Sequence, residues 1–529
     1  MQTKSVIGHS VPITRPLYSS RISSYSGRNI PEKPRVLPHV KKSSLLRFTA
    51  KPQVSCNSFN TNDDANLVES VFTKNVLLFF VFPAIGGMLF GYDIGATSGA
   101  LLSMTSSTVS GTVWYDLSTT ETGLVVSLSL AGALLGSGIA LVVGDSLGRR
   151  KELILGGVLY MIGAGLVSQS PGGDAIGLSV VELGRLLYGL GIGFSMHAAP
   201  AYIAETSPAS VRGVLISTKE AFIVGGILLG YVVSYLEIST LGGWRYIYGA
   251  AMPVAAVLIW GMAYLPESPR WLALKQKNDE ALDSLQRIYG AEYDTLQLKD
   301  EVDQMVKVSD MDEEGSSLFQ ERYRKPLFVG VSLMLFQQIT GQPSVLYYAA
   351  KIFQDAGFES ADSATGISVI LGLFKLGMTG VAIATVDSWG RRPLLLLGVS
   401  GIVASLLMLG TIQSGSLSLP HSVDIWANVV ALLVYVGAYQ VSFGPISWLI
   451  VGEVFPLSIR GQALALATLT NFASNFLVSL YIPLLQENLG PAGLYMTFAG
   501  IGCLALYVIY SIVPETKGKS LEEIEDLWS

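Results

Sequence analysis

Twelve apolar segments, each long enough to cross a lipid bilayer, run through this sequence of 529 residues and limit its possible folds more than any other feature. Crossing the hydrocarbon core takes about 20 predominantly apolar residues in a helix. In lipid, every backbone N–H and C=O group needs a partner within the protein, and a helix supplies one. We therefore expect an all-α membrane protein with twelve transmembrane helices. The segments are 75–104, 119–144, 151–169, 178–203, 211–236, 243–265, 325–354, 363–386, 392–414, 422–454, 460–488 and 491–513.

The composition excludes the main soluble classes of protein. Half of the residues are hydrophobic, 14% are charged and the mean hydropathy is +0.48, which leaves too little polar surface to cover a soluble body of this length. The net charge of −6 is scattered, so we expect no nucleic-acid partner. With two cysteines, Cys56 and Cys503, and four histidines at unrelated spacings, we expect no disulfide, metal site or cofactor.

The first 70 residues differ in composition from the rest of the chain. Ten lysines and arginines and many serines lie within residues 1–60, where Glu32 is the only acid. A segment rich in Arg and Ser and poor in acids is typical of an organelle transit peptide, and no apolar core of a secretory signal is present. We expect a plastid address, with processing near Val54-Ser55-Cys56. The alternative is a disordered cytosolic tail.

Three motifs occur once in each half of the chain, which indicates an internal repeat. The pairs are Asp145-Ser146-Leu147-Gly148-Arg149-Arg150 with Asp387-Ser388-Trp389-Gly390-Arg391-Arg392, Glu205-x-x-Pro208-x-x-x-Arg212-Gly213 with Glu453-x-x-Pro456-x-x-x-Arg460-Gly461, and Pro266-Glu267-Ser268 with Pro514-Glu515-Thr516. Two repeated six-helix halves can rock around a central site. We therefore divide the chain into an N-terminal bundle (71–265), a linker with short helices (266–324), a C-terminal bundle (325–513) and a tail (514–529).

The distribution of basic residues among the loops predicts the orientation. Loops after the even-numbered spans carry Arg149, Arg150, Lys151, Arg212, Arg270, Arg391, Arg392 and Arg460. The opposite loops carry almost none. Basic loops stay on the cytoplasmic side, which in a plastid corresponds to the stroma, so both termini are expected there.

These motifs resemble those of the sugar porter family of the major facilitator superfamily over nearly all of residues 75–525. The matching stretches are Gly91-Tyr92-Asp93, the two Asp-x-x-Gly-Arg-Arg loops, Pro200-Ala201-Tyr202-Ile203-Ala204-Glu205, Pro266-Glu267-Ser268-Pro269-Arg270-Trp271, Phe336-Gln337-Gln338-x-x-Gly341, Gly444-Pro445-x-x-Trp448 and Pro514-Glu515-Thr516-Lys517-Gly518. Within the family, the chain looks most similar to plant xylose–proton-symporter-like and plastid sugar transporters. The resemblance implies the major facilitator fold, a sugar substrate, protons as co-substrate and a monomer in the plastid envelope, in its inner membrane by our expectation.

Charged residues at the membrane faces form a candidate gate. They either anchor helix ends or form ion pairs that clamp the two halves together in one state, and the duplication of both acids and bases favours a clamp. Family members use these motifs to hold the outward-facing state. The candidates are Asp145, Arg149, Arg150, Glu205, Arg212, Glu267, Arg270, Asp387, Arg391, Arg392, Glu453, Arg460 and Glu515.

Charges inside a span are costly and mark candidate functional sites. Asp93 lies in the first span and Arg185 in the fourth. An Asp beside an Arg stays ionised, and separating the two lets it take a proton, which is what a proton-coupled carrier needs. The resemblance implies this role for the pair. The alternative is a static pair that positions helices.

Two further intramembrane charges depart from the family pattern. Glu220 stands where sugar porters commonly have a sugar-binding glutamine, and Lys375 where a bacterial xylose symporter has an asparagine. The fifth and eighth spans face each other in this architecture, so we expect Glu220 and Lys375 to pair, or nearly pair, in at least one state. Alternatively, Lys375 extends outward and Glu220 is protonated.

Neutral polar and aromatic side chains form the candidate sugar site, to which Glu220 and Lys375 are added. A sugar needs donors, acceptors and an aromatic platform for its apolar face. The residues that the resemblance implies are Gln337, Gln338, Tyr347, Tyr348, Trp448, Asn471 and Asn475. Pro343 replaces a sugar-contacting asparagine and Phe472 a tryptophan. His197 has no partner that the sequence identifies and is expected to be structural.

Two other functions compete with proton-coupled sugar transport. An uncoupled sugar uniporter would use Asp93 only structurally. A non-transporting sugar sensor of this fold would usually carry a long cytoplasmic tail, whereas about fifteen residues follow Val513. An enzyme is not expected, because no Ser–His–Asp, metal or phosphate-loop constellation is present. The particular sugar, the direction of transport and the choice between symport, uniport and antiport stay open at this point.

Overall fold

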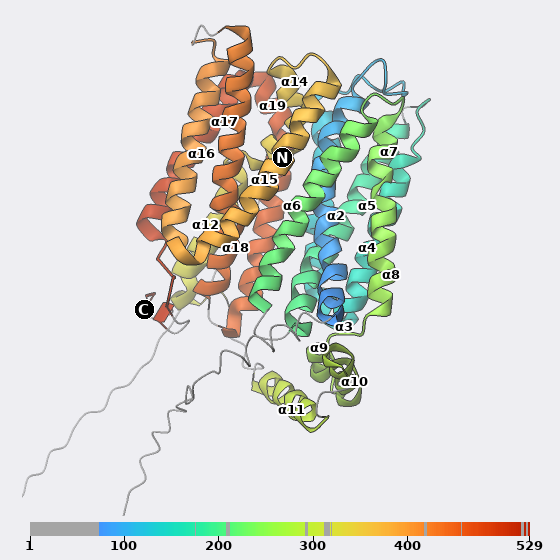
Figure 1. Cartoon of the computed structure of the whole chain (residues 1–529), viewed down its shortest axis with the longest axis vertical. Helices are drawn as coiled ribbons and strands as arrows, with labels where there is room; N and C mark the ends of the chain where they lie inside the picture. The colour runs from blue at the N-terminus through green and yellow to red at the C-terminus, as the bar shows by residue number, and fades with distance from the viewer. Residues whose placement is uncertain are drawn as a thin grey trace, which may run out of the picture. The chain divides into compact units, whose positions relative to one another are not determined.

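The computed structural model describes residues 74–174, 176–207, 212–290, 295–311, 318, 320–416, 420–455, 457–519, 523–524 and 527–528. The expected transit peptide lies outside the described residues, and so do the side chain of Arg212 and the motif residues Pro208 and Pro456. All regular secondary structure within the described ranges is helical. The long helices stand side by side in one bundle (Figure 1).

The first half contains six spans built from seven helices. They are α2 (Lys74–Met104), α3 (Thr119–Leu147), α4 (Arg149–Ser168), α5 (Ile176–Thr206), α6 (Arg212–Glu237), α7 (Gly243–Gly249) and α8 (Ala251–Tyr264), of which α7 and α8 share one span. Helix α3 begins with a capping box, because Ser118 accepts from the backbone of Glu121 and Glu121 accepts from the backbone of Ser118.

The second half also contains six spans, two of which are broken into shorter helices. Its elements are η1 (Glu321–Tyr323), α12 (Arg324–Ile339), α13 (Gln342–Tyr347), α14 (Ala349–Asp355), α15 (Ala361–Trp389), α16 (Arg391–Gln413), α17 (His421–Val441), α18 (Phe443–Val454) and α19 (Leu457–Ile512). The seventh span runs through α12, α13 and α14, and the tenth through α17 and α18. Helix α19 contains the last two spans, separated at Gly490, whose φ of 68° is left-handed.

These breaks explain why length and hydropathy alone find ten candidate spans in the described part of the chain. The seventh span is too interrupted to qualify, because Gly341 takes a φ of +99° between α12 and α13. The eleventh and twelfth spans qualify as one. Counting the broken span and dividing α19 gives the predicted twelve transmembrane helices.

Glycines let the helices of the first half approach closely, as is usual in membrane bundles. A side-chain carbon on Gly91 or Gly95 of α2 would lie 1.8 and 2.1 Å from the backbone oxygens of Ile223 and Ile227 on α6. The same holds for Gly189 of α5, where the carbon would lie 2.0 Å from the oxygen of Ser129 on α3. This packing brings α2, α3 and α5 together around the buried charges described below.

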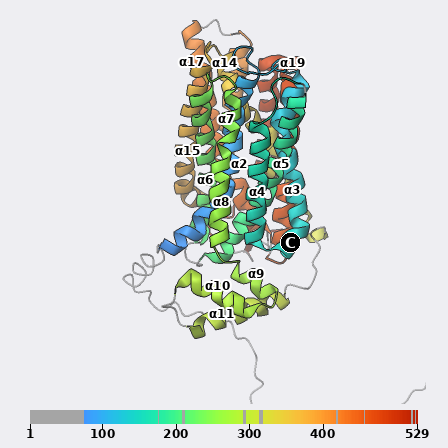
Figure 2. The ribbon, with the colours of Figure 1, turned by 90° about the vertical axis from the view of Figure 1, so that its right-hand side faces the viewer.

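Three short helices come between the two halves in the sequence. In space, they lie beyond one end of the bundle (Figure 2). They are α9 (Pro269–Leu274), α10 (Asn278–Tyr289) and α11 (Thr295–Met311). They share a small apolar core formed by Trp271, Leu272, Ala281, Leu285, Leu298 and Val302. Trp271 also donates from Nε1 to the carbonyl of Asp145 at 2.9 Å, which fixes this layer to the basic end of α3.

Two side-chain hydrogen bonds join the two halves at the end opposite the basic loops. Thr119 donates to Glu487 at 2.8 Å, and Ser239 donates to Asp362 at 2.8 Å. Deeper in the membrane, Tyr231 donates to the carbonyl of Leu346 at 2.9 Å. At the basic end, every ion pair between described residues joins groups of the same half.

Candidate functional site

A buried ion pair lies in the first half, at the level of the bundle interior. Asp93 on α2 and Arg185 on α5 are each 1% exposed and form a hydrogen-bonded ion pair. Ser129 on α3 donates to Asp93 at 2.8 Å and accepts from Arg185 at 2.9 Å. Arg185 also donates to the carbonyl of Val125 at 2.9 Å. Asp93 and Arg185 were expected to be neighbours. In the structure they are in contact, and Ser129 of a third helix, α3, bonds to both.

Tyrosines surround this pair and exclude water from it. Tyr188 donates to the carbonyl of Leu89 at 2.9 Å, and the Arg185 guanidinium lies 5.1 Å from the ring centre of Tyr248. Tyr347, from the second half, interacts electrostatically with both members of the pair, and its hydroxyl has no hydrogen-bond partner among the described residues. A carboxylate held in such surroundings depends on its arginine to stay ionised.

Amide side chains in the second half form a hydrogen-bonded cluster. Gln337 on α12 donates to the carbonyl of Phe443 at 2.7 Å and accepts from Asn471 on α19 at 2.6 Å. Gln338 is 4% exposed, yet its Oε1 atom has no described hydrogen-bond partner. The same is true of Nε2 of Gln440 and Oγ of Ser447. Buried polar atoms normally have partners, so these groups suit a polar ligand.

The remaining sugar-site candidates separate into groups that are available for a ligand and groups that are occupied. Trp448 is half-buried and packs at the edge of the core. Tyr348 donates to the carbonyl of Ser479 at 3.1 Å, and Asn475 accepts from the Ser479 hydroxyl at 3.2 Å. Tyr348 therefore holds the seventh span against the eleventh, whereas the Asn475–Ser479 bond lies within the eleventh span. The role of both residues in sugar binding stays a prediction.

Phe472 and Pro343, which replace residues typical of the family, are both buried. Phe472 on α19 packs edge-on against Phe90 of α2, with ring centres 5.8 Å apart. It thereby joins the two halves near the interior charges. Pro343 lies in the first turn of α13, where its missing N–H costs no helical hydrogen bond.

Glu220 and Lys375 face each other across the two halves without forming an ion pair in this structure. Lys375 on α15 is 3% exposed, donates to Gln440 and lies 5.2 Å from the ring centre of Tyr439. Glu220 on α6 interacts electrostatically with both Lys375 and Lys219. Pairing of Glu220 with Lys375 therefore stays a prediction for another state. Lys219 and Gln440 were not among the residues predicted from the sequence, although a second charge beside Glu220 is visible there.

The first of two charge clusters lies at the basic end of the first half. Here the N-terminal charge cluster denotes Asp145, Arg149, Arg150, Glu205, Glu267 and Ser268. Arg149 pairs with Asp145 at 2.8 Å and with Glu205 at 3.5 Å, and Ser268 donates to Glu205. Glu267 accepts from the backbone N–H of Arg150 at 2.8 Å, and burial raises the pKa of Glu267 despite that bond.

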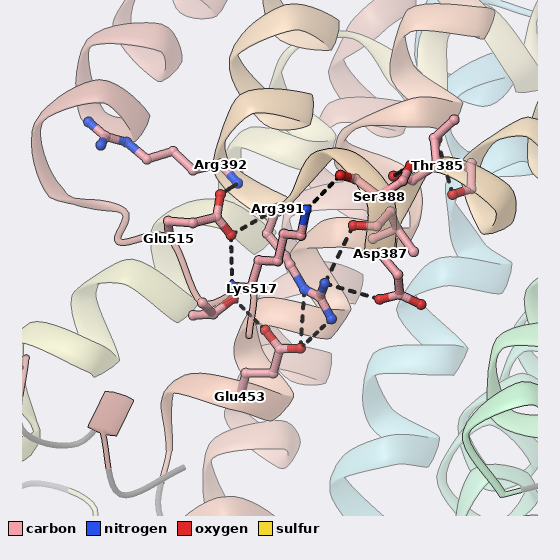
Figure 3. A network of polar contacts seen from close by, with 11 residues as sticks. Thr385, Asp387, Ser388, Arg391, Arg392, Glu453, Glu515 and Lys517 are labelled. Atoms are coloured by element: carbon pink, nitrogen blue, oxygen red, sulfur yellow. Dashed lines mark hydrogen bonds and ion pairs between the residues drawn. The ribbon is translucent and has the colours of Figure 1, made fainter. Parts of the chain in front are cut away.

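The second cluster repeats this arrangement in the second half (Figure 3). The C-terminal charge cluster denotes Asp387, Arg391, Arg392, Glu453, Glu515 and Thr516. Arg391 pairs with Glu453 at 3.0 Å and with Asp387 at 3.1 Å, and Thr516 donates to Glu453. Glu515 accepts from the backbone N–H groups of Arg391 and Arg392 at 3.0 Å each, at the start of α16. A carboxylate there also favours the positive end of the helix dipole.

No ion pair with a described residue is formed by the gate candidates Arg150, Arg270, Arg392 and Arg460. Arg150 and Arg392 donate to backbone carbonyls of Ala263 and Tyr510. Arg460 donates to the carbonyl of Phe455 at 3.1 Å. Arg270 is exposed, and the Arg212 side chain lies outside the described residues. The ion pairs that the structure forms at the basic end lie within each half. The expected clamp between the halves stays a prediction for another state.

His197, for which the sequence identified no partner, has one in the structure. Its Nδ1 lies 2.7 Å from Oε1 of Glu152, a residue of α4 whose side chain is fully buried. Glu152 was not predicted from the sequence, because it follows the basic motif directly and its position is typical of a helix start. Its burial could not be predicted from the pattern of its neighbours. Groups of three or more His, Cys, Asp or Glu able to hold a metal are not found in the described part of the chain.

Comparison with known proteins identifies the family of this chain. Residues 79–528 match the family described as sugar (and other) transporter. The chain is 50% identical over 473 residues to the D-xylose-proton symporter-like 3, chloroplastic, of Arabidopsis thaliana, covering 86% of this chain and 83% of that protein. It is 32% identical over 457 residues to the galactose-proton symporter of Escherichia coli, covering 86% and 95%.

Solved structures of a bacterial relative have the same fold. The partially occluded inward open conformation of the xylose transporter XylE from E. coli superposes with a TM-score of 0.73 at 29% identity, covering 85% of this chain and 100% of that one. The proton:xylose symporter XylE bound to 6-bromo-6-deoxy-D-glucose superposes with a TM-score of 0.71 at 30% identity, covering 86% and 99%. The twelve helices therefore form the major facilitator fold, and this chain belongs to the sugar (and other) transporter family.

Proposed function

We propose that this protein moves a sugar across a plastid envelope membrane by alternating access, and that protons bound at Asp93 drive the movement. The observation that carries the proposal is the buried Asp93–Arg185 pair in the first half, together with a cluster of amides with unpartnered polar atoms in the second. Tyr347 reaches from the second half toward this pair, so movement between the halves changes the surroundings of Asp93. The relatives named as proton symporters support the same function.

The arrangement of contacts supports one place for this structure in the transport cycle. The halves are bonded to each other toward the end opposite the basic loops, through pairs such as Thr119–Glu487 and Ser239–Asp362. The basic end has ion pairs only within each half of the described chain. We assign this structure to an inward-facing state, open toward the basic side. Alternating access then requires those contacts to break and the basic ends to approach each other.

The composition of the first 70 residues supports a plastid location, and one relative is named as chloroplastic. We place the protein in the inner envelope membrane with both termini in the stroma, since the basic loops lie on the side of the termini. It acts as a monomer within lipid. Fusing residues 1–56 to a fluorescent protein tests the address, and a diffuse cytosolic signal contradicts it.

The coupling test uses purified protein in proteoliposomes, with a panel of labelled sugars and an imposed pH gradient. Asp93→Asn imitates a permanently protonated carboxyl. We expect pH-driven accumulation to vanish in this variant while counterflow of sugar between equal pH values survives. Accumulation that persists in Asp93→Asn removes Asp93 from the coupling step. A wild-type protein that exchanges sugar but ignores the gradient is an uncoupled uniporter, and one that binds sugar without exchange is a sensor.

A further inference from the structure

The buried pair of Glu152 and His197 has no part in the transport scheme above. Glu152 lies one turn into α4 from the basic end, and His197 lies on the facing side of α5. Their contact of 2.7 Å joins a fully buried carboxylate to an imidazole that is 27% exposed. The second carboxylate oxygen of Glu152 has no partner among the described residues. A histidine placed this way is reachable by protons and tied to a group that solvent does not reach.

The charges around the pair are unbalanced. Arg149 from α4 and Asp145 from α3 both interact with Glu152, and Glu205 from α5 pairs with Arg149. Glu267, beyond the end of α8, also interacts with Arg149, but the charge of Arg150 balances that of Glu267. Three carboxylates therefore share one guanidinium. A proton on the imidazole relieves this excess of negative charge.

The second half provides an internal control for the importance of the pair. By the repeat of the Asp-x-x-Gly-Arg-Arg motif, Leu394 occupies the position of Glu152, and it is 2% exposed. By the repeat of the Glu-x-x-Pro motif, Pro445 occupies the position of His197. Arg391 consequently has only Asp387 and Glu453 as acidic partners among the described residues. The fold of the cluster does not require a buried acid and a histidine, so the first half carries them in addition.

We propose that Glu152 and His197 form a second proton-binding site, distinct from Asp93, through which pH on the basic side controls the N-terminal charge cluster. The proton adds to the free Nε2 of His197, while Nδ1–H donates to Glu152. The protonated imidazole then neutralises Glu152, and Arg149 stays with Glu205. When the proton leaves Nε2, Glu152 lacks a cation, and Arg149, three residues before it on α4, is drawn away from Glu205. Low pH on the side of the basic loops therefore favours the conformation described here.

The test is the rate of sugar exchange at equal sugar concentration and equal pH on both sides of the membrane, so that no gradient drives transport. Imidazoles ordinarily titrate near pH 6.5. We expect the wild-type rate to change by at least about fivefold between about pH 5.5 and 7.5, the size of a modest coupling between two sites. His197→Gln removes the inflection but leaves a buried carboxylate uncompensated. The double variant Glu152→Gln, His197→Gln keeps a neutral hydrogen-bonded pair, so it preserves the fold while removing the inflection.

A control variant separates this site from others. His421→Gln removes another described histidine, at the start of α17 and at the opposite membrane face, and should keep the inflection. Survival of the inflection in the double variant, or its loss in His421→Gln, overturns the proposal.

A readout that does not depend on transport covers the case in which no sugar is exchanged. The chain has four histidines, so nitrogen NMR of histidine-labelled protein can follow each imidazole after assignment with His197→Gln. The His197 signal is expected to differ between the wild type and Glu152→Gln, because the variant removes the carboxylate that lies against Nδ1. An imidazole signal that does not change between about pH 5 and 8, the range in which histidine changes its charge, overturns the proton site whatever the transport assay shows.

Discussion

The two halves of this protein share the same ends but have different interiors. At the basic end, each half places an Arg between an exposed Asp and a half-buried Glu, and each holds a second Glu on the first N–H groups of a helix. Gly148 and Gly390 join the parts with φ values of +89° and +94°, and a side-chain carbon on either would lie 2.6 or 2.8 Å from the second Glu. The same skeleton therefore occurs twice in the chain.

The interiors differ in the kind of polar group that they bury. The first half buries Asp93 with Arg185 and Glu152 with His197. The second half buries amides, such as Gln337 hydrogen-bonded to Asn471, with Lys375 as its charged residue of the eighth span. In the function proposed here, proton handling belongs mainly to the first half and sugar binding mainly to the second. The comparison suggests that the repeated ends move the halves, whereas the interiors decide what is moved.

The largest loss of stability and sugar binding is expected from substitutions at Glu220 and Lys375, where the two interiors meet. Glu220→Gln leaves Lys219 and Lys375 without their shared anion, whereas Lys375→Asn leaves Glu220 with Lys219. Glu220→Gln should therefore be the more damaging change, although it restores the residue usual in sugar porters. Removing one member of a buried charge pair can cost about 3–5 kcal/mol.

The double variant Glu220→Gln, Lys375→Asn should recover expression and sugar binding, with an altered sugar preference. A double-mutant cycle on thermal stability and binding measures the interaction, which for neighbours is about 0.5–3 kcal/mol. Strictly additive effects would show that the two charges do not communicate across the halves, and Glu220 would then be better interpreted as a separate proton site.

An intermediate loss of stability is expected from substitution of the two Glu residues of the repeated ion pairs. Arg391 donates twice to Glu453, at 3.0 and 3.3 Å, whereas Arg149 approaches Glu205 only to 3.5 Å. We expect Glu453→Gln to lower the free energy of unfolding by about 1.5–3 kcal/mol, the range for hydrogen bonds to charged groups, and Glu205→Gln by less.

Thermal unfolding in detergent compares the two Gln variants directly. The matched controls are Asp145→Asn and Asp387→Asn, whose carboxylates are 80% and 82% exposed and should contribute little. Equal losses for Glu205→Gln and Glu453→Gln would mean that the two ends are energetically equivalent despite their different geometry.

The smallest effect is expected from the hydroxyls that donate to these same carboxylates. Ser268 donates to Glu205 and also caps α9 by accepting from the N–H of Trp271 at 3.2 Å, whereas Thr516 donates to Glu453 outside any helix. Ser268→Ala should cost about 1 kcal/mol more than Thr516→Ser, which keeps its hydroxyl. Thermal unfolding is again the measurement, and a Thr516→Ser variant as unstable as Ser268→Ala would assign the loss to packing rather than hydrogen bonding.

The number of spans could be predicted from sequence because the length of an apolar segment is a local property. Each predicted segment corresponds to one span, including the seventh, which is broken at Gly341, and the last two, which follow each other directly within α19 and are separated at Gly490. Asp93 and Arg185 were expected to be functional because an isolated charge in lipid is costly, and their proximity followed from the resemblance to sugar porters. Their shared partner Ser129 did not, because serine is common at helix contacts and carries no pattern of its own.

Side-chain partners between helices could not be predicted in the same way. His197 had no partner that the sequence identified, and the structure gives it Glu152. Lys375 was expected opposite Glu220, and its hydrogen bond goes instead to Gln440 of its own half. The sequence predicts that a charged residue lies in a span. Which neighbour that residue contacts depends on the rotation of each helix about its axis.

By itself, the sequence determined that this chain is a twelve-span membrane protein with a repeated end motif and charges placed inside its spans. Those properties depend on segment length, hydropathy and order, and each can be read from neighbouring residues. The tertiary structure alone decided that the ion pairs of Arg149 and Arg391 lie within the halves, and that Glu152 is fully buried against His197. These outcomes depend on how closely glycine-lined helices approach and on which faces they turn to each other, which is a property of the packed bundle.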